Sequence, residues 1–332
     1  MLRNSMKKIL FSVTALFAVV SLVAAGCSDD NDNENVSSAD KPSIVVTTNI
    51  LGDVVSNMVG DSFNVEVIMP PGSDPHDFQA SAQQVEKMMS ADLLIVNGAN
   101  FEEGMLSVIE SAEADGVMVF EAISVVSQLE GSDDHGHDDH EGHDDHDDHE
   151  GHDHGGIDPH FFTDPARMAV VVEELSEFLV ANFPNVDQGF VSTANDYAQE
   201  LIDLDEEVNE ILSEIPQEGK VLVTNHAVFA YFADSYGFEI LGEIIPSAST
   251  LSSANAQQLA SLADELSSNS VKAIFADASA SDTLARTLAA EVGGIEVITL
   301  FTESLGEPGS SGANYIEMVK FNAQAIASGL VG

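Results

Sequence analysis

The sequence predicts an α/β protein made of two similar lobes with parallel sheets, joined by one long bridging α-helix. Short β-branched apolar runs alternate with helical patterns over 41–185 and again over 216–332, which is typical of parallel sheets with crossover helices. One amphipathic stretch over 186–215 separates the two sets, and we expect it to form a continuous helix. At 332 residues the chain is long enough for two cores.

The N-terminal lobe, predicted over 41–185, opens with the β-branched run "SIVVTT", followed by a helical pattern. In that pattern apolar residues recur at steps of three and four from Leu51 to Val59. The later segments repeat this alternation. Strands are expected at 43–48, 63–69, 92–98 and 116–120, and helices at 49–61, 81–91, 102–112 and after Pro165.

The bridging helix carries apolar residues from Phe190 to Ile211 at steps of three and four, with acidic residues between them. Pro216 ends it, because proline cannot continue a helix. The C-terminal lobe follows. Its strands are expected at 220–224, 238–244, 271–277 and 295–300. One helix is expected to begin at about 226, a second to lie near 254–268, a third to end at about 292 and a C-terminal helix to begin at about 313.

The start of the chain reads as a secretory signal peptide over 1–26, with basic residues before an apolar run that ends in small residues. Cys27, the single cysteine, follows Ala-Gly and resembles the lipidated cysteine of a lipoprotein, although Ala24 stands where leucine is more usual. An ordinary signal or a membrane anchor is the alternative. We expect a disordered tether over 27–40, no internal disulfide, and a membrane-anchored protein outside the cytoplasm.

The charge balance excludes one class of partner. With 10 basic and 57 acidic residues the formal net charge is −47, and nucleic acid binding requires Lys and Arg. An acidic surface favours cations, but it also suits a protein that works in high salt, where charge repulsion is screened.

Eleven histidines fall into two groups. One group lies in an acidic, glycine-containing segment at 131–156, where most histidines recur every third residue and match no helical face. We interpret this segment as a mobile loop that collects metal or senses its level, with a solvated spacer as the alternative. Its histidines are His135, His137, His140, His143, His146, His149, His152 and His154.

The other three histidines stand alone, and two carboxylates accompany them at the predicted strand ends or in the loops that follow. They are His76, His160, His226, Glu303 and Asp277. Ligands bind beyond the carboxyl ends of parallel strands, so this placement predicts a cleft between the lobes. Three imidazoles and one carboxylate suit Zn²⁺ and, less well, Mn²⁺ or Fe²⁺. Taken singly, each residue has an ordinary alternative as a turn residue, a loop carboxylate or a helix cap.

Several motifs resemble the substrate-binding lipoproteins of zinc and manganese ABC transporters, in the same order along nearly the whole mature chain. They are "TTNILGDVVSNMVGD", "MPPGSDPHDFQASAQQVEKMMSADLLIVNGANFEEGM", "DPHFFTDP", "VTNHAVFAYFADSYGF" and "NYIEMVKFNAQAI". The resemblance implies the metal-binding periplasmic-binding-protein fold, with a long helix between two lobes.

The resemblance also implies a set of metal ligands. It places the three family histidines on His76, His160 and His226, and the family's last carboxylate on Glu303. The family usually has aspartate at the position of Glu303, so the fourth ligand is either Glu303 or Asp277. If Asp277 is not a ligand, it supports the ligands without touching the ion or caps a helix. Phe162 stands where the family often has tryptophan, which should affect packing more than chemistry.

The function that follows is capture of a metal ion, most consistent with Zn²⁺, and delivery to the membrane permease of an ABC transporter. The histidine as third ligand and the histidine-rich loop resemble the zinc branch of the family. Manganese or iron is the alternative cargo. A secreted zinc hydrolase and a metal-storing adhesin are the alternative functions, and the absence of His-Glu-x-x-His argues against the first. We expect a monomer that is not an enzyme.

Overall fold

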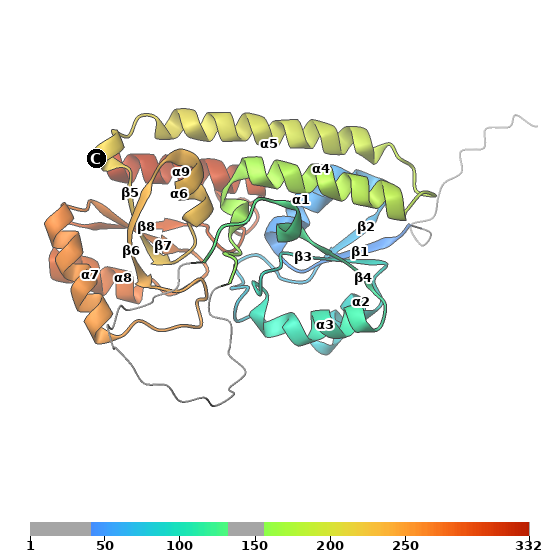
Figure 1. Cartoon of the computed structure of the whole chain (residues 1–332), viewed down its shortest axis with the longest axis horizontal. Coiled ribbons are helices and arrows are strands. Elements are labelled where there is room, and N and C mark those ends of the chain that lie inside the picture. Colours follow the sequence, from blue (N-terminus) through green and yellow to red (C-terminus); the bar gives the residue numbers. More distant parts are fainter. Residues whose placement is uncertain (1–40, 132–155, 332) are drawn as a thin grey trace, which may run out of the picture. The chain divides into compact units, whose positions relative to one another are not determined.

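The computed structural model describes residues 41–131 and 156–331. Within this part of the chain two four-stranded sheets are formed, and every strand pair in them is parallel. The two sheets have the same topology, because in each the first strand pairs with both the second and the third, and the fourth lies at an edge. This confirms the predicted fold class of two similar parallel-sheet lobes (Figure 1).

The first sheet has the strand order β2-β1-β3-β4. Residues alternate between its two faces: Ile44 and Val46 of β1 face one apolar cluster, whereas Val45 faces another. The elements of this lobe are β1 (Ser43–Val46), α1 (Asn49–Val59), β2 (Asn64–Val67), α2 (Ala82–Met89), β3 (Leu93–Val96), α3 (Leu106–Ala114), β4 (Met118–Glu121) and α4 (Pro165–Asn182).

The second sheet has the strand order β6-β5-β7-β8. Its strands lie within one to two residues of the predicted ranges, as do those of the first sheet. The elements of this lobe are β5 (Val221–His226), α6 (Ala230–Tyr236), β6 (Glu239–Ile245), α7 (Ala256–Asn269), β7 (Ala273–Asp277), α8 (Thr283–Val292), β8 (Glu296–Leu300) and α9 (Tyr315–Val331).

Short 3₁₀ helices occur in the connections, because single tight turns suffice where the chain changes direction. They are η2 (Gly60–Ser62), η3 (Glu103–Met105), η4 (Ala122–Val125), η5 (Phe161–Thr163) and η6 (Gln217–Gly219).

The long helix α5 (Phe190–Leu212) links the lobes. Its buried residues, from Phe190 to Leu212, recur at steps of three and four, as the sequence pattern predicts. At 1.5 Å per residue, its 23 residues extend over roughly 34 Å. Figure 1 shows α5 running over α4 and α1 of the first lobe and over α9 of the second, and all three helices contact it.

The largest apolar cluster is shared by the two lobes. It contains residues of α1, α4 and the inner face of the first sheet, but also residues of α6, α9 and the second sheet, with α5 between them. Smaller clusters lie on the opposite faces, under α2 and α3 in one lobe and under α7 and α8 in the other. The lobes are therefore joined by a continuous core.

None of the helices within residues 41–131 and 156–331 is both long and apolar enough to cross a bilayer. The predicted signal peptide, Cys27 and the tether over 27–40 lie outside the described residues. So do all eight histidines of the acidic segment at 131–156.

Candidate metal centre

Four side chains from distant parts of the chain meet between the two sheets. His76 lies in the loop after β2, His160 directly precedes η5, His226 is the last residue of β5, and Glu303 follows β8. One donor atom from each lies within 4.8 Å of the others. All four side chains are at most 2 % exposed. The sequence-predicted set is thus brought together between the two lobes, and three of the four side chains lie at or just after the carboxyl end of a strand.

The Glu303 carboxylate lies at the centre of this group. Its Oε1 atom is 2.8 Å from Nε2 of His226 and 3.3 Å from Nε2 of His160. Its Oε2 atom is 3.5 Å from Nε2 of His76. The three imidazoles therefore turn the same ring nitrogen toward one carboxylate, and each lobe supplies two of the four side chains.

The two Asp-Pro-His segments hold their histidines with the same local hydrogen bond, from the histidine backbone to the aspartate side chain. The backbone N–H of His76 donates to Asp74, and that of His160 donates to Asp158, over 2.9 and 2.8 Å. Aspartate side chains commonly accept from the backbone two residues further on. The tripeptide thus fixes each histidine backbone as part of a turn, so the turn role and the site role coexist.

Carboxylates also orient two of the rings from behind. Nδ1 of His76 lies 3.1 Å from Oε1 of Glu103, and Nδ1 of His160 lies 2.8 Å from Oδ1 of Asp158. When such a ring is neutral, this contact holds its proton on Nδ1, leaves the lone pair on Nε2 and increases the basicity of Nε2 as a metal ligand. Sequence reasoning missed both groups: Asp158 had a signal in its motif, but Glu103 had none.

Aromatic packing completes the walls around these rings. Phe101 meets the edges of His76 and His160, with ring centroids 5.1 and 5.6 Å away. Phe162, at the position where the family often has tryptophan, is 1 % exposed and packs against Phe101 with ring centroids 5.3 Å apart. Apolar walls lower the local dielectric constant, which strengthens the interaction of the donor atoms with a cation.

The charges in this group are strongly coupled. Burial by itself lowers the pKa of His76, but the contacts of its ring with Glu103 and Glu303, together with the charges of Glu303 and Asp74, raise it to about 10. Burial likewise opposes protonation of His160, yet Asp158 and Glu303 raise its pKa to about 9. Burial alone would raise the pKa of Glu303, but His160 and His226 hold it well below its usual range.

Asp277 lies behind this group. It ends β7, is 3 % exposed, and its carboxylate accepts from the backbone N–H of Ser279 at 3.0 Å and from its hydroxyl at 2.5 Å. Burial and the charge of Glu303 raise its pKa. The helix-cap alternative for Asp277 is wrong, because α8 begins only at Thr283. His226 is likewise not a helix cap, since it belongs to β5 and α6 begins at Ala230.

Buried polar atoms in the group have unused bonding capacity. Within the described part of the chain, Nε2 of His76, Nε2 of His160 and Oε2 of Glu303 are buried without a hydrogen-bond partner. Unsatisfied buried polar atoms are costly, and here they converge on one point. Three nitrogen donors and one oxygen donor match the ligands that bind divalent zinc in proteins.

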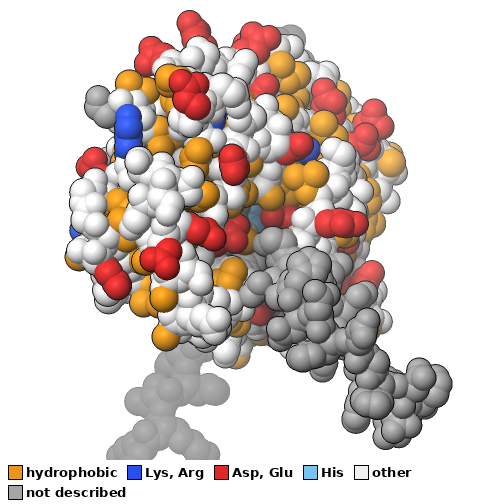
Figure 2. All heavy atoms as spheres, turned by 60° about the vertical axis from the view of Figure 1, so that its left-hand side comes forward, with side chains coloured by type: hydrophobic (Ala, Val, Ile, Leu, Met, Phe, Trp, Pro, Cys, Tyr) orange, Lys and Arg blue, Asp and Glu red, His pale blue; other side chains and the backbone are white. Residues whose placement is uncertain are grey.

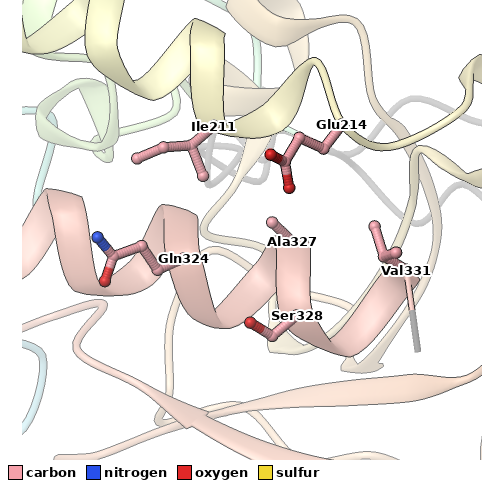
Figure 3. A pocket seen from close by; sticks show the side chains of 6 residues that line it. All are labelled: Ile211, Glu214, Gln324, Ala327, Ser328 and Val331. Carbon is pink, nitrogen blue, oxygen red and sulfur yellow. The ribbon is translucent and has the colours of Figure 1, made fainter.

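One surface hollow among the described residues lies apart from these four side chains. A hollow between the end of α5 and α9 is lined by Ile211, Glu214, Gln324, Ala327, Ser328 and Val331, so it holds none of the four grouped side chains (Figure 3). The face in Figure 2 carries many acidic and few basic side chains, with a small area of histidine surface flanked by carboxylates. Positive ions are therefore attracted to this face.

Two parallel-sheet lobes that enclose three imidazoles and a carboxylate between them define a metal-binding member of the solute-binding proteins. The periplasmic zinc-binding protein TroA of Treponema pallidum has a similar structure, with a TM-score of 0.74 and 27 % identity over 87 % of this chain and 99 % of TroA. Residues 44–329 match the family model described as zinc-uptake complex component A, periplasmic (ZnuA), and the chain belongs to this family. This confirms the resemblance that the sequence motifs indicate.

Relatives of similar sequence carry the name of a different metal. The manganese ABC transporter substrate-binding lipoprotein PsaA of Streptococcus anginosus is 27 % identical over 98 % of this chain and 99 % of its own length. The manganese-binding lipoprotein MntA of Halalkalibacterium halodurans is also 27 % identical, with the same coverage. The relatives therefore agree on metal binding and differ in the named ion.

Proposed function

We propose that this protein is the substrate-binding component of a metal ABC uptake transporter, and that His76, His160, His226 and Glu303 hold the transported ion. The convergence of four buried donor atoms from both lobes carries this proposal. Family membership and the lipoprotein names of the relatives support it. In this proposal the protein is anchored outside the cytoplasm through Cys27 and passes its ion to a membrane permease.

We propose zinc as the cargo. Three imidazole nitrogens and one carboxylate favour Zn²⁺, whereas Mn²⁺ prefers a larger share of oxygen ligands. The names of the family and of TroA both include zinc. Manganese is the second candidate, because both oxygens of Glu303 face the imidazoles and a bidentate carboxylate would give a five-coordinate site. The manganese names of the relatives point the same way.

A carrier role fits the donor set better than hydrolysis. Catalytic zinc sites keep one position open for water, whereas four protein ligands close a tetrahedral site. The solute-binding character of the family agrees with a carrier. In a carrier the histidines of segment 131–156 act as an accessory that collects metal, and a storage protein would instead depend on that segment alone.

Calorimetric titration of Zn²⁺ and Mn²⁺ tests the proposal on a lipid-free protein that lacks residues 132–155. One tight zinc site per chain, lost in His226→Ala, is the expected result. Retention of the site in Asn57→Ala, a change on the exposed side of α1, is the matched control. Loss of all tight binding on deletion of 132–155 would make the acidic segment the binding site. Tight manganese with weak zinc would keep the carrier role and change its ion.

A further inference from the structure

A buried asparagine joins three segments of the chain beside the metal centre. Asn49 is the first residue of α1 and is 7 % exposed. Its Oδ1 accepts from the backbone N–H of Leu305 at 2.7 Å. Its Nδ2 group donates to the carbonyl of Pro70 at 3.0 Å and to Oγ of Ser304 at 2.8 Å. The acceptor and both donors of this amide are therefore engaged.

Ser304 extends the connection to the loop that carries His76. Its hydroxyl oxygen also accepts from the backbone N–H of Gly72 at 2.8 Å, and the same N–H approaches the carbonyl of Leu305 at 3.1 Å. Gly72 has φ of +78°, a backbone conformation that glycine adopts without strain. Asn49, Ser304 and Gly72 form what we call the amide clamp, which crosses from one lobe to the other.

The amide clamp lies directly beside two of the four donors. Ser304 is the neighbour of Glu303 in the chain, and Gly72 precedes His76 in the same loop. The contact between Glu303 and His76 is the longest of the three carboxylate–imidazole contacts, at 3.5 Å, and it spans the two lobes. The position of Glu303 relative to His76 therefore depends on the segments that the clamp connects.

The other donors are positioned by different groups. His160 is held by Asp158 and by the hydrogen bond from Asn97 to the carbonyl of Pro159, at 2.9 Å. His226 is fixed within β5 and lies in the same lobe as Glu303. A change at Asn49 should thus act mainly through His76.

We propose that Asn49 is a positioning residue for metal binding, which sets the distance between His76 and the Glu303 carboxylate and so tunes the affinity of the centre. This inference rests on the proposed function. Aspartate at this position would keep the acceptor for Leu305 but would place an oxygen against the Pro70 carbonyl, where a donor is required. The hydrogen bond to Pro70 would be lost, and the amide clamp would no longer hold the loop that carries His76.

A double-mutant cycle separates this role from general support of the fold. Asn49→Asp should weaken zinc binding by about 10- to 100-fold, the range found for groups that support metal ligands. In a His76→Ala background the same change should cost less than about 3-fold, because the donor through which it acts is already gone. Asn57→Asp makes the same chemical change at an exposed position of α1 and should leave the affinity unchanged.

The measurement is zinc affinity by chelator competition, with the visible absorption of bound Co²⁺ as a second readout of coordination. Asn49→Asp and His76→Ala should alter the cobalt spectrum in the same way. Equal losses of affinity in both backgrounds, or a wild-type spectrum and affinity in folded Asn49→Asp, would overturn the proposal. If Asn49→Asp does not fold, Ser304→Ala replaces it in the same cycle. Absence of a tight site in the unmodified protein would instead refute the proposed function itself.

Discussion

Metal binding should release about two protons per ion near neutral pH, because two imidazoles of the metal-free centre are charged there. The pKa values of about 10 for His76 and about 9 for His160 place both groups in the protonated form at neutral pH. A metal ion requires the neutral ring, whose lone pair it takes. Binding must therefore displace one proton from each of these two histidines.

The sign and size of the pH dependence follow from these values. Because both pKa values are raised in the metal-free state, protons compete with metal up to about pH 9. The affinity should rise by about 100-fold per pH unit below that point, tenfold for each proton released. Histidines with the ordinary pKa of about 6.5 would give a dependence that ends near neutral pH.

Calorimetry at about pH 8, in buffers of different ionisation enthalpy, measures the number of released protons directly. Glu103→Gln should reduce this number toward one, because the carboxylate behind Nδ1 of His76 is the foremost group that raises its pKa. Glu110→Gln removes an exposed carboxylate from α3 and should leave the number unchanged. Release of less than one proton by the unmodified protein would refute the reasoning, since the two rings could not then both be protonated before the ion arrives.

Three further outcomes are expected. His226→Ala should weaken zinc binding by more than the roughly 100-fold typical of supporting groups, because it removes a donor atom, and chelator competition measures this. Leu201→Ala on the buried face of α5 should cost about 2–5 kcal/mol of unfolding free energy in denaturant titration, whereas the neighbouring Ile202→Ala, at a side chain 38 % exposed, should cost less than about 1 kcal/mol. Without metal, the stability from the two raised histidine pKa values is fully present below about pH 6.5 and is lost as the pH rises through 9 to 10, so the melting temperature should fall over that window.

The sequence predicts the strands and helices of both lobes well, because these elements depend on local patterns. Each strand is a short β-branched run and each helix has an apolar face, so the alternation is visible without tertiary information. The ends of elements are less certain. β5 ends at His226, two residues beyond the predicted strand, because His226 pairs with Ile245 of β6. α8 begins at Thr283, well beyond Asp277, whose carboxylate accepts hydrogen bonds from Ser279 in the connecting loop instead of capping the helix.

The four proposed donors could be predicted because three of them stand at the end of a strand or in a loop that follows one, because His160 lies in a second Asp-Pro-His motif, and because the motifs resemble a known family. The groups that support them could not. Asn49 and Ser304 are 255 residues apart, and neither belongs to a local pattern that marks a functional role. Glu103 lies in the first turn of the helix predicted over 102–112, where an acidic residue is ordinary. The contact between Asn49 and Ser304 arises only when the lobes pack, and that between Glu103 and His76 only when the first lobe folds.

Because the proposed donors are divided between the lobes, the number of donors that reach one ion depends on how the lobes are positioned. The first lobe supplies two imidazoles, and the second supplies one imidazole and the carboxylate that carries the charge. In the proposed metal centre each lobe alone would be a two-donor fragment, and a tight centre would exist only as a chelate of both fragments. The effective concentration of one fragment at the other depends steeply on their separation. A displacement of the lobes by little more than the length of a metal–ligand bond would convert a four-donor chelate into a two-donor one, without any change in the chemistry of the ligands.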